Sequence, residues 1–282
     1  MSNTSFSKKR IRISIAGEGV NAVIDGLACS VFIDKTACPA YPVAKVVIKG
    51  LGMNTMTQLT RLGYEAFTRS QNLIQIDAGD ESGMSLAYQG DIVTAWANFN
   101  TAPDIQFEIK ALGGYFASMQ PDNPLSINGS QSIEAVVSQV AAKAGFVVQN
   151  EGVTGDIKNT ELHGDVMTKV QTIARTKGFN VIVDGKKIIL LPNQKIRGTP
   201  VPNISASNGL IGYPTFDDKG VNFECMYRPD IEIGGLAKLE TIVPRASGEW
   251  VVIGVKHTLS ANDPHNQVWK TSVQGIFPNY GR

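Results

Sequence analysis

Four acidic residues stand close together in the chain, and paired carboxylates are the first chemistry that they suggest. They are Asp77, Asp80, Glu81 and Asp91. Two carboxyl groups held several ångströms apart can cleave a glycosidic bond, one as acid and the other as nucleophile or base. Residues 79–83 read Gly-Asp-Glu-Ser-Gly, which is typical of a polar turn between strands. We therefore expect a solvated acidic rim and predict no catalytic residue.

Two other motifs of known chemistry lack the sequence context or the residues that their sites require. Residues 17–22 read Gly-Glu-Gly-Val-Asn-Ala, a loose form of the dinucleotide-binding fingerprint. That fingerprint needs a helix after the glycines, whereas residues 20–34 hold Asp25-Gly26 and strand-forming residues. We therefore predict a turn or bulge in a β-hairpin. The GxSxG motif of hydrolase nucleophiles is absent from the sequence.

The histidines and cysteines do not have the spacing of a metal or nucleophile site. They are His163, His257, His265, Cys29, Cys38 and Cys225. A metal site built on His257 and His265 would need a third ligand such as Asp263, so separate surface or core histidines are the simpler interpretation. A Cys29–Cys38 bridge is possible, but the odd cysteine count favours free thiols in a reducing compartment. We expect no metal and no cofactor.

The three tryptophans all fall in strand-like segments. They are Trp96, Trp250 and Trp269. Exposed aromatic side chains can stack on sugars, and with interleaved basic residues they can stack on bases. Lys256 and Lys270 are too few for a base-stacking platform, so packing in a core or an interface is the favoured interpretation. A carbohydrate-binding β protein remains a rival hypothesis.

Composition and charge exclude several classes of protein. The 282 residues are 43% hydrophobic and 18% charged, as expected of a chain with a packed core. The 26 basic and 25 acidic residues nearly balance, which excludes strong binding to a phosphate backbone through bulk charge. We expect neither a signal peptide nor a membrane helix, because no long apolar run is present. Residues 1–60 are mainly basic and residues 61–116 mainly acidic, an asymmetry that could guide self-association.

The first part of the chain alternates apolar and polar residues with the period of β-strands. Ile11, Ile13 and Ile15 show this alternation with polar neighbours. Further strand patterns cover 30–34, 45–49, 72–77, 91–99 and 105–110. One short helix is predicted over 54–62, with Asn54 as its N-cap and Gly63 as its stop. Residues 1–118 therefore predict a first antiparallel β-barrel.

The pattern changes over residues 119–198. The predicted elements are, in order, a helix over 133–144, a strand at 146–148, a helix over 166–174, and strands at 180–183 and 187–191. Asp165 is the expected N-cap of the second helix and Gly178 its stop. The dipeptide Asp184-Gly185 favours a type I′ turn between the two strands. This segment predicts a small α+β module.

Strand patterns return after a linker of Pro and Asn residues at 199–203. They cover 221–227, 239–243, 249–258 and 267–277. The last two strands form a predicted long hairpin that parallels the hairpin of residues 90–110, a weak internal repeat. The fold class is therefore mainly β with an α+β insertion. We expect two tube-like antiparallel barrels, at 1–118 and 199–282, flanking a helix-strand module at 119–198.

Several of these segments together resemble a known family. They read Asn72-Leu-Ile-Gln-Ile-Asp-Ala-Gly79, Leu86-Ala-Tyr-Gln-Gly-Asp-Ile92 and Ala102-Pro-Asp-Ile-Gln-Phe-Glu-Ile-Lys-Ala111. Their order of strand, Ala-Gly turn, aromatic-x-Gly-x-Ile strand and long hairpin resembles the first barrel of baseplate hub proteins of contractile-tailed bacteriophages. Residues 25–34, 44–51, 251–260 and 269–273 are similar to further strands of the same family.

The resemblance implies an assembly as well as a fold. Hubs of this family form homotrimers in which two barrels per chain make a pseudo-sixfold ring, and the ring joins the tail tube protein to the central spike protein. It implies a place in the tail baseplate of the virion, after synthesis and assembly in the host cytoplasm. From its place between the two barrels, we expect the 119–198 module to contact wedge or sheath proteins. DNA would pass through the ring without sequence-specific binding.

We therefore predict a structural baseplate hub protein with no enzymatic activity, no cofactor and no membrane insertion. Three alternatives remain. The first is the hub-like part of a type VI secretion spike or of a phage-tail-like bacteriocin, which would share the fold. The second is a peptidoglycan hydrolase of the tail that uses the carboxylates between Asp77 and Asp91. The third is the carbohydrate-binding β protein.

Overall fold

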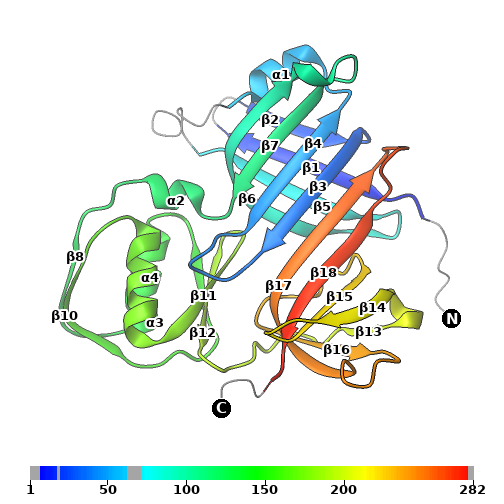
Figure 1. The fold of residues 1–282 in the computed structure, drawn as a ribbon. Helices are drawn as coiled ribbons and strands as arrows, with labels where there is room; N and C mark the ends of the chain where they lie inside the picture. The colour runs from blue at the N-terminus through cyan, green and yellow to red at the C-terminus, as the bar shows by residue number, and fades with distance from the viewer. Residues whose placement is uncertain (1–6, 18–19, 62–70, 279–282) are drawn as a thin grey trace. The chain divides into compact units, whose positions relative to one another are not determined.

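The computed structural model describes residues 7–17, 20–61 and 71–278. The chain divides into two compact units, and neither unit is one continuous stretch of sequence (Figure 1). The first consists of Met1–Ile33, Val43–Leu112 and His257–Lys270. The second consists of Asp34–Pro42, Gly113–Lys256 and Thr271–Arg282. Strands dominate both units, and the predicted fold class, mainly β with an α+β insertion, is confirmed.

The first unit is built on one antiparallel sheet. Its elements are β1 (Arg10–Gly17), β2 (Val20–Asp25), β3 (Ala28–Lys35), β4 (Val43–Lys49), α1 (Met53–Leu59), β5 (Leu73–Asp80), β6 (Gly83–Asn98), the 3₁₀ turn η2 (Phe99–Thr101) and β7 (Gln106–Leu112). The strand order is β3-β4-β7-β6-β5-β1-β2. Strand β6 pairs with β5 along its first part and with β7 along its second, so it belongs to both halves of the sheet.

Alternation of apolar residues explains why these strands form. In β1, the side chains of Ile11, Ile13 and Ile15 are buried and their neighbours are not. Ile13 lies opposite Ile76 of β5, whose buried residues alternate in the same way. Since neighbouring side chains point to opposite faces of a strand, one face of the sheet becomes the core. The predicted strands of this unit are confirmed.

The short helix of the first unit differs in its cap from the prediction. Helix α1 spans Met53–Leu59, and its N-cap residue is Gly52, which has no side chain to cap the helix. Asn54 therefore lies inside the first turn and is not the N-cap. The helix also ends earlier than predicted, at Leu59, because the backbone of Thr60 is extended. The predicted stop, Gly63, lies outside the described residues.

The second unit contains the remaining elements, apart from the ends of β17 and β18 that fall within His257–Lys270. They are α2 (Tyr115–Met119), β8 (Leu125–Ser132), α3 (Ile133–Ala142), β9 (Val147–Asn150), β10 (Asp156–Leu162), α4 (Val166–Lys177), β11 (Phe179–Asp184), β12 (Lys187–Pro192), β13 (Asn203–Ser205), the 3₁₀ turn η3 (Ala206–Asn208), β14 (Leu210–Phe216), β15 (Val221–Met226), β16 (Leu236–Glu240), β17 (Gly248–Ala261) and β18 (Trp269–Ile276). Its larger sheet has the order β14-β15-β18-β17, with β16 beside β17 and β13 beside β16.

Helices α3 and α4 begin where the sequence indicates, whereas the short helix α2 was not predicted and α3 ends at Ala142, two residues before its predicted end. The side chain of Ser132 accepts a hydrogen bond from the Ala135 N–H at the start of α3, and Asp165 does the same for the Thr168 N–H in α4. Helix α4 ends at Gly178, whose φ of 72° is left-handed, a conformation that glycine adopts without strain. The apolar stripes of both helices pack into one core with β11 and β12.

Two features of this module differ from the prediction. Strands β8 and β10 form a two-stranded antiparallel ribbon that the sequence patterns did not indicate. The β11–β12 turn is centred on Gly185 and Lys186, because Asp184 pairs with Lys187, and of the two central residues only Gly185 has positive φ. This geometry fits a type II′ turn and not the predicted type I′ turn, which requires positive φ at both central positions.

The long β17–β18 hairpin is present as predicted, and its tip, residues 257–270, belongs to the first unit. Contacts inside that unit hold the tip in place. The Lys49 ammonium lies 2.8 Å from the Asp263 carboxylate, and the Asn262 amide donates to the Leu27 carbonyl oxygen. No helix in the described part of the chain is long and apolar enough to span a membrane.

Candidate assembly surfaces

The carboxylates that could have formed a glycosidase pair are dispersed in the structure. Asp91 lies opposite Leu73 in the β5–β6 register, four residues along β5 from Asp77. At about 3.4 Å per residue this separates their backbone positions by roughly 14 Å along the strand direction, more than the ~5–9.5 Å between the carboxyl groups of glycosidases. Asp77 and Asp80 are three residues apart on β5 and so point to opposite faces.

The environment of Asp80 also differs from that of a catalytic acid. Its carboxylate accepts hydrogen bonds from the Ser7 and Ser82 hydroxyl groups and lies 3.2 Å from the Lys9 ammonium. The hydrogen bond from Ser7, followed by those from Ser82, holds the pKa of Asp80 well below its usual range. A general acid needs the opposite shift. Asp80 is therefore an ionised structural residue.

The glycine motif at 17–22 is part of a β-hairpin, as predicted. Strands β1 and β2 pair antiparallel, with Gly17 opposite Val20, and no helix follows the motif. Residues 18 and 19 lie outside the described part of the chain. The hairpin cannot supply the helix N-terminus that a dinucleotide phosphate needs.

The three histidines have different surroundings. His163 is mostly exposed and its Nε2 lies 3.7 Å from the Glu161 carboxylate, whereas His257 is fully buried in β17. His265 donates its backbone N–H to Asp263, the residue that would have completed a metal site. Asp263 is paired with Lys49. Across residues 7–17, 20–61 and 71–278, no group of three metal-ligating side chains comes together.

All three cysteines are free thiols, Cys29 and Cys225 buried and Cys38 half-buried. Burial raises the thiol pKa to about 12 in Cys29 and Cys225 and to about 11 in Cys38. Because the thiolate is the reactive form, we expect negligible labelling of Cys29 and Cys225 in the folded protein by a chromogenic disulfide reagent at pH 8. In guanidinium chloride, three thiols per chain should react. A count below three would indicate a disulfide and contradict this assignment.

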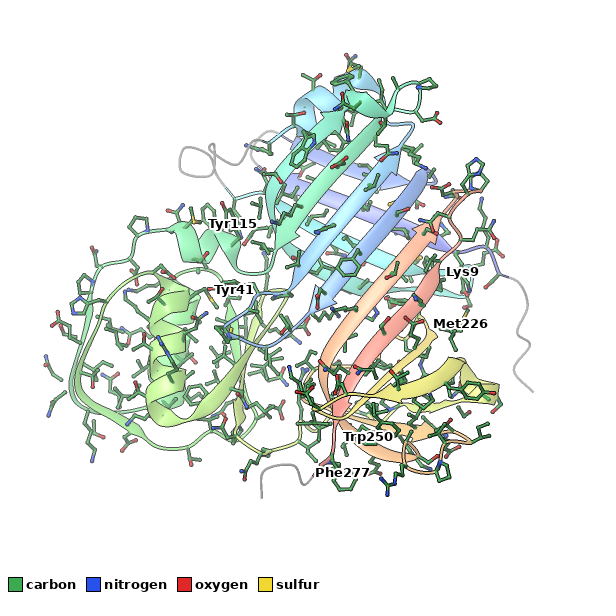
Figure 2. All side chains as sticks on the ribbon, viewed as in Figure 1. Lys9, Tyr41, Tyr115, Met226, Trp250 and Phe277 are labelled. Atoms are coloured by element: carbon green, nitrogen blue, oxygen red, sulfur yellow. The ribbon has the colours of Figure 1, made fainter. Side chains whose placement is uncertain are left out.

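The three tryptophans differ in how far they are buried. Trp250 is buried, donates its indole N–H to the Ala246 carbonyl oxygen at 2.8 Å, and meets Phe277 edge-on at a centroid distance of 5.8 Å (Figure 2). Trp269 is half-buried in β18. Trp96 is 39% exposed on β6. Core packing therefore accounts for Trp250, and only Trp96 presents an open aromatic face.

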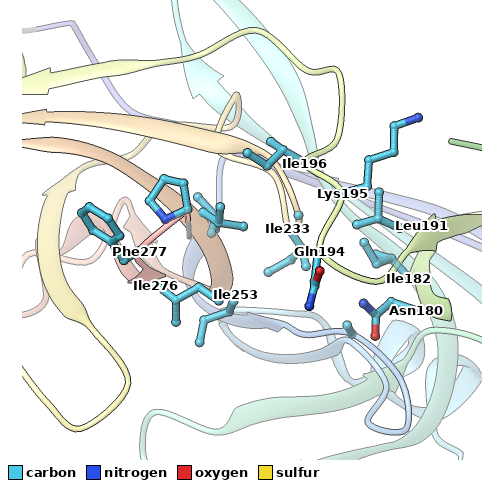
Figure 3. A pocket seen from close by; sticks show the side chains of 15 residues that line it. Asn180, Ile182, Leu191, Gln194, Lys195, Ile196, Ile233, Ile253, Ile276 and Phe277 are labelled. Atoms are coloured by element: carbon cyan, nitrogen blue, oxygen red, sulfur yellow. The ribbon is translucent and has the colours of Figure 1, made fainter. Parts of the chain in front are cut away.

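An apolar cavity of about 230 Å³ lies in the second unit (Figure 3). Aliphatic side chains such as Ile182, Leu191 and Ile233 form most of its wall, and Asn180, Gln194 and Lys195 supply polar groups. The lining contains no carboxylate, thiol or imidazole, and the ammonium of Lys195 donates a hydrogen bond to the Glu151 carbonyl oxygen, so the cavity lacks a paired nucleophile and base.

The first candidate assembly surface is the outer edge of the second unit's sheet. Strand β14 is the last strand in the order and pairs with β15 alone among the described strands. Its residues read Leu-Ile-Gly-Tyr-Pro-Thr-Phe, without a charge, and only Pro214 is buried. The exposed apolar side chains here are those of Ile211, Tyr213, Phe216 and Met226, the last at the end of β15. Ile211 pairs with Glu224 on the outward face of the sheet and Phe216 pairs with Val221 on the other face, so the apolar side chains surround the edge from both sides. We call these four residues, with the adjoining Asp217 and Asp218, the β14 surface.

A groove of about 660 Å³ runs beside the β14 surface. Ile211 and Tyr213 form one wall, and alternate residues of β15 and β18 form a polar floor. The floor is fixed by hydrogen bonds from Ser272 to Glu224 and from Gln274 to Asp217. The outward face of this sheet is therefore polar, with its apolar residues gathered at the β14 edge.

The second candidate surface lies on the first unit. Trp96 of β6 is opposite Glu108 of β7, and Lys110, two residues further along β7, is opposite Lys45 of β4. These positions share one face of the sheet, because paired residues and residues two apart point the same way. Phe99 is exposed in the turn that follows β6. We call Lys45, Trp96, Phe99 and Lys110 the β6 surface.

Sequence analysis missed most of these surface residues. Trp96 was identified as a core or interface residue, and it is the one tryptophan that fits an interface. Neither Tyr213 nor Phe216 was identified, because residues 203–216 were not predicted as strands. The signal that could have found them is the uncharged stretch 210–216 between polar turns, since a soluble edge strand usually carries charge.

Comparison with known proteins gives a consistent result. The family model described as baseplate hub gp41 matches residues 10–270. The fold resembles the 43 kDa tail protein of prophage MuSo2 from Shewanella oneidensis, with a TM-score of 0.66 and 9% identity over 95% of this chain and 97% of that one. It also resembles a tail protein from Neisseria meningitidis MC58, with a TM-score of 0.66 and 8% identity over 95% and 96% of the two chains.

A third solved structure broadens the likeness. The Escherichia coli c3393 protein, described as a component of the type VI secretion system with structural similarity to T4 tail proteins gp27 and gp5, has a TM-score of 0.58 and 7% identity. The match covers 93% of this chain and 76% of that one. At identities this low, likeness to solved structures shows the fold alone. No curated protein matches this sequence.

Proposed function

The chain belongs to the baseplate hub gp41 family of phage tail proteins, and from that premise we propose that it is one subunit of a trimeric ring in the tail baseplate. The family match covers residues 10–270 and supports a structural role in the baseplate. The finer proposal is that the ring joins the tail tube protein to the central spike protein and forms part of the conduit for DNA. Synthesis and assembly in the host cytoplasm belong to the same proposal.

Two β-rich parts in one chain support the ring. Three chains with two similar barrels each would offer six positions around one axis, which would match a hexameric tube on one side and a trimeric spike on the other. Within this proposal, residues 1–118 and 199–282 supply the barrels, and the 119–198 module contacts wedge or sheath proteins. The long hairpins β6–β7 and β17–β18 are the elements that such a repeat would share.

We also propose that the protein has no enzymatic activity. The separation of Asp77 from Asp91, the ionised state of Asp80 and the lack of a carboxylate, thiol or imidazole in the lining of the apolar cavity all support this. Incubation of the purified chain with peptidoglycan should release no soluble fragments. Cleavage that is lost in an Asp91→Ala variant of unchanged stability would overturn the proposal and restore the hydrolase alternative.

The trimer is tested by the native mass of the full chain. We expect light scattering to give about 91 kDa, three times the chain mass of 30.3 kDa, and negative-stain images to show rings with a central hole. A species of 30.3 kDa at every concentration, unchanged when candidate tube and spike proteins are added, would contradict the ring.

The type VI secretion alternative rests on the c3393 likeness, which concerns the fold. Phage tails and secretion spikes share this fold class, so likeness to c3393 does not separate the two systems. The family match to a phage baseplate hub favours the phage tail. Genes for tail sheath and tape-measure proteins beside this gene would support the same choice, and genes for secretion-membrane components would contradict it.

A further inference from the structure

Strand β14 is an exposed, uncharged edge strand, as expected of a strand that a partner covers in an assembly. Tyr213 is 70% exposed and Phe216 50% exposed, and of the seven residues of β14 only Pro214 is buried. Natural edge strands are usually protected by charged residues or by coverage, because an uncharged edge invites uncontrolled association. β14 carries no charge. Pro214 removes one backbone donor from the strand, so side chains, and not a full backbone ladder, would make the contact.

The β6 surface presents a matching combination of apolar and charged groups. Trp96 and Phe99 are exposed apolar side chains. Lys45 and Lys110 are both exposed and stand directly opposite each other on adjacent strands, an arrangement that costs stability through like-charge repulsion. Glu108, the acidic neighbour on β7, accepts a hydrogen bond from Asn98. Within the described residues neither lysine has an acidic partner. An acidic group from another chain would therefore offset the repulsion between the two lysines.

The β14 surface supplies the opposite charge. Asp217 and Asp218 follow β14 directly and are exposed. The Asn222 side-chain amide, together with the backbone N–H groups of Gly220 and Lys219, lowers the pKa of Asp217 to about 2, so this carboxylate is ionised at neutral pH. In the described part of the chain, neither aspartate forms an ion pair. Apolar side chains beside unpaired acids on one surface thus complement apolar side chains beside unpaired bases on the other.

We propose that the β14 surface of one copy of this chain docks on the β6 surface of a neighbouring copy. The proposal rests on the trimeric ring proposed above and specifies its lateral contact. Two different surfaces of one chain that fit each other make a head-to-tail contact, and head-to-tail contacts generate rings when the rotation closes. A β14-to-β14 contact would instead close a dimer and leave both lysines without a partner. Tyr213 and Trp96 are the expected aromatic anchors.

The first experiment introduces a charge into the apolar part of the contact. Tyr213→Asp should shift the native mass from the trimer to the 30.3 kDa chain, with an unchanged circular dichroism spectrum because the side chain is exposed. Phe216→Asp is the second variant and should behave alike. Ile242→Asp is the matched control, because Ile242 is 80% exposed and belongs to neither surface. It should keep the mass of the wild type.

The second experiment tests which two surfaces meet. Lys110→Glu should raise the trimer dissociation constant about tenfold, since it places like charges together across the contact. Adding Asp218→Lys to the same chain should restore the wild-type constant, because opposite charges then meet again between neighbouring copies. Asp218→Lys alone should weaken the trimer like Lys110→Glu.

The outcomes distinguish this contact from the ring itself. A wild-type trimer whose mass is unchanged by Tyr213→Asp, Phe216→Asp and Lys110→Glu would overturn the docking contact and leave the trimeric ring standing. Dissociation by Tyr213→Asp without rescue of Lys110→Glu by Asp218→Lys would overturn the pairing of these two surfaces. A wild-type chain that is monomeric at every concentration, and that stays so when candidate tube and spike proteins are added, would overturn both proposals.

Discussion

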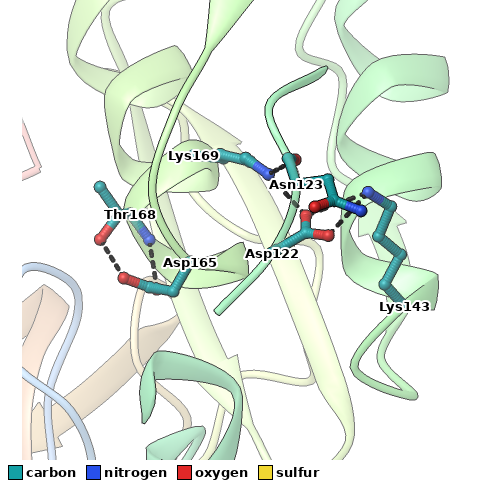
Figure 4. A network of polar contacts seen from close by, with 6 residues as sticks. All are labelled: Asp122, Asn123, Lys143, Asp165, Thr168 and Lys169. Carbon is teal, nitrogen blue, oxygen red and sulfur yellow. Dashed lines mark hydrogen bonds and ion pairs between the residues drawn. The ribbon is translucent and has the colours of Figure 1, made fainter. Parts of the chain in front are cut away.

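Asp122→Ala should lower the free energy of unfolding by about 3 kcal/mol, which is typical of removing one partner of a buried ion pair. Lys169 of α4 is fully buried, and its ammonium lies 2.5 Å from the Asp122 carboxylate and 2.6 Å from the Asn123 carbonyl oxygen (Figure 4). Removal of Asp122 would leave a buried positive charge with one neutral acceptor. Chemical denaturation followed by circular dichroism measures the loss.

Two variants serve as controls for this network. Lys143 also binds Asp122, at 3.0 Å, but its side chain is 39% exposed, so Lys143→Met should cost under about 1 kcal/mol. Lys169→Met removes the buried charge itself and fills a similar volume, and it should therefore cost less than Asp122→Ala. Equal losses from Asp122→Ala and Lys143→Met would contradict the central role of the buried lysine.

The same carboxylate predicts a pH dependence with a definite sign. The hydrogen bond from Lys169, followed by that from Lys143, lowers the pKa of Asp122 in the folded state. A lowered folded-state pKa contributes stability that is present above the unfolded pKa of about 3.9 and is lost as the pH falls through the folded value. As the pH falls from 5 through the folded-state pKa of Asp122, the free energy of unfolding should therefore decrease more for the wild type than for Asp122→Ala. Parallel pH curves for the two proteins would refute this assignment.

Trp250→Ala should destabilise the second unit by about 3–5 kcal/mol, the range for truncating a buried aromatic side chain. Trp250 is 6% exposed, belongs to the core formed with Val221, Phe223 and Val273, and donates a hydrogen bond to Ala246. Gly275 gives it room, because a Cβ at that position would lie 2.9 Å from the Cβ of Trp250. Denaturant unfolding followed by far-ultraviolet circular dichroism measures the change.

Trp96→Ala is the matched control for Trp250→Ala. Trp96 is more than a third exposed, so its truncation should cost little in the free energy of unfolding. Under the docking contact proposed above, it should instead weaken the trimer. A large stability loss from Trp96→Ala, or a small one from Trp250→Ala, would contradict the separation of these tryptophans into surface and core.

Local patterns in the sequence were sufficient for most elements. The alternation around Ile11, Ile13 and Ile15 predicts a strand because the two faces of a strand differ in exposure, and the structure has that strand. Asp165 and Gly178 mark the ends of α4 because a side-chain acceptor and a left-handed glycine satisfy groups that a helix leaves open. The prediction of Asn54 as an N-cap was wrong because the N-cap is the residue directly before the first helical residue. The helix begins at Met53, so its N-cap is Gly52.

The family resemblance was also available from the sequence alone. The strand, turn and hairpin patterns between 72 and 111 were sufficient to suggest a baseplate hub, and the family match over residues 10–270 confirms it. The same reasoning set aside the carboxylates between Asp77 and Asp91 as catalytic residues. The register of β5 with β6 supplied the physical reason, which is their separation along the sheet.

Tertiary structure alone decided which residues share a face and which are covered. Three tryptophans on strands look alike in sequence, yet the chain buries Trp250 and exposes Trp96, because burial depends on what the rest of the fold places over a strand. Lys45 and Lys110 are 65 positions apart, and only the β4–β7 register sets them opposite each other. Composition and period thus determine that strands and helices form, whereas long-range pairing determines the buried Lys169 network and the surfaces available for assembly.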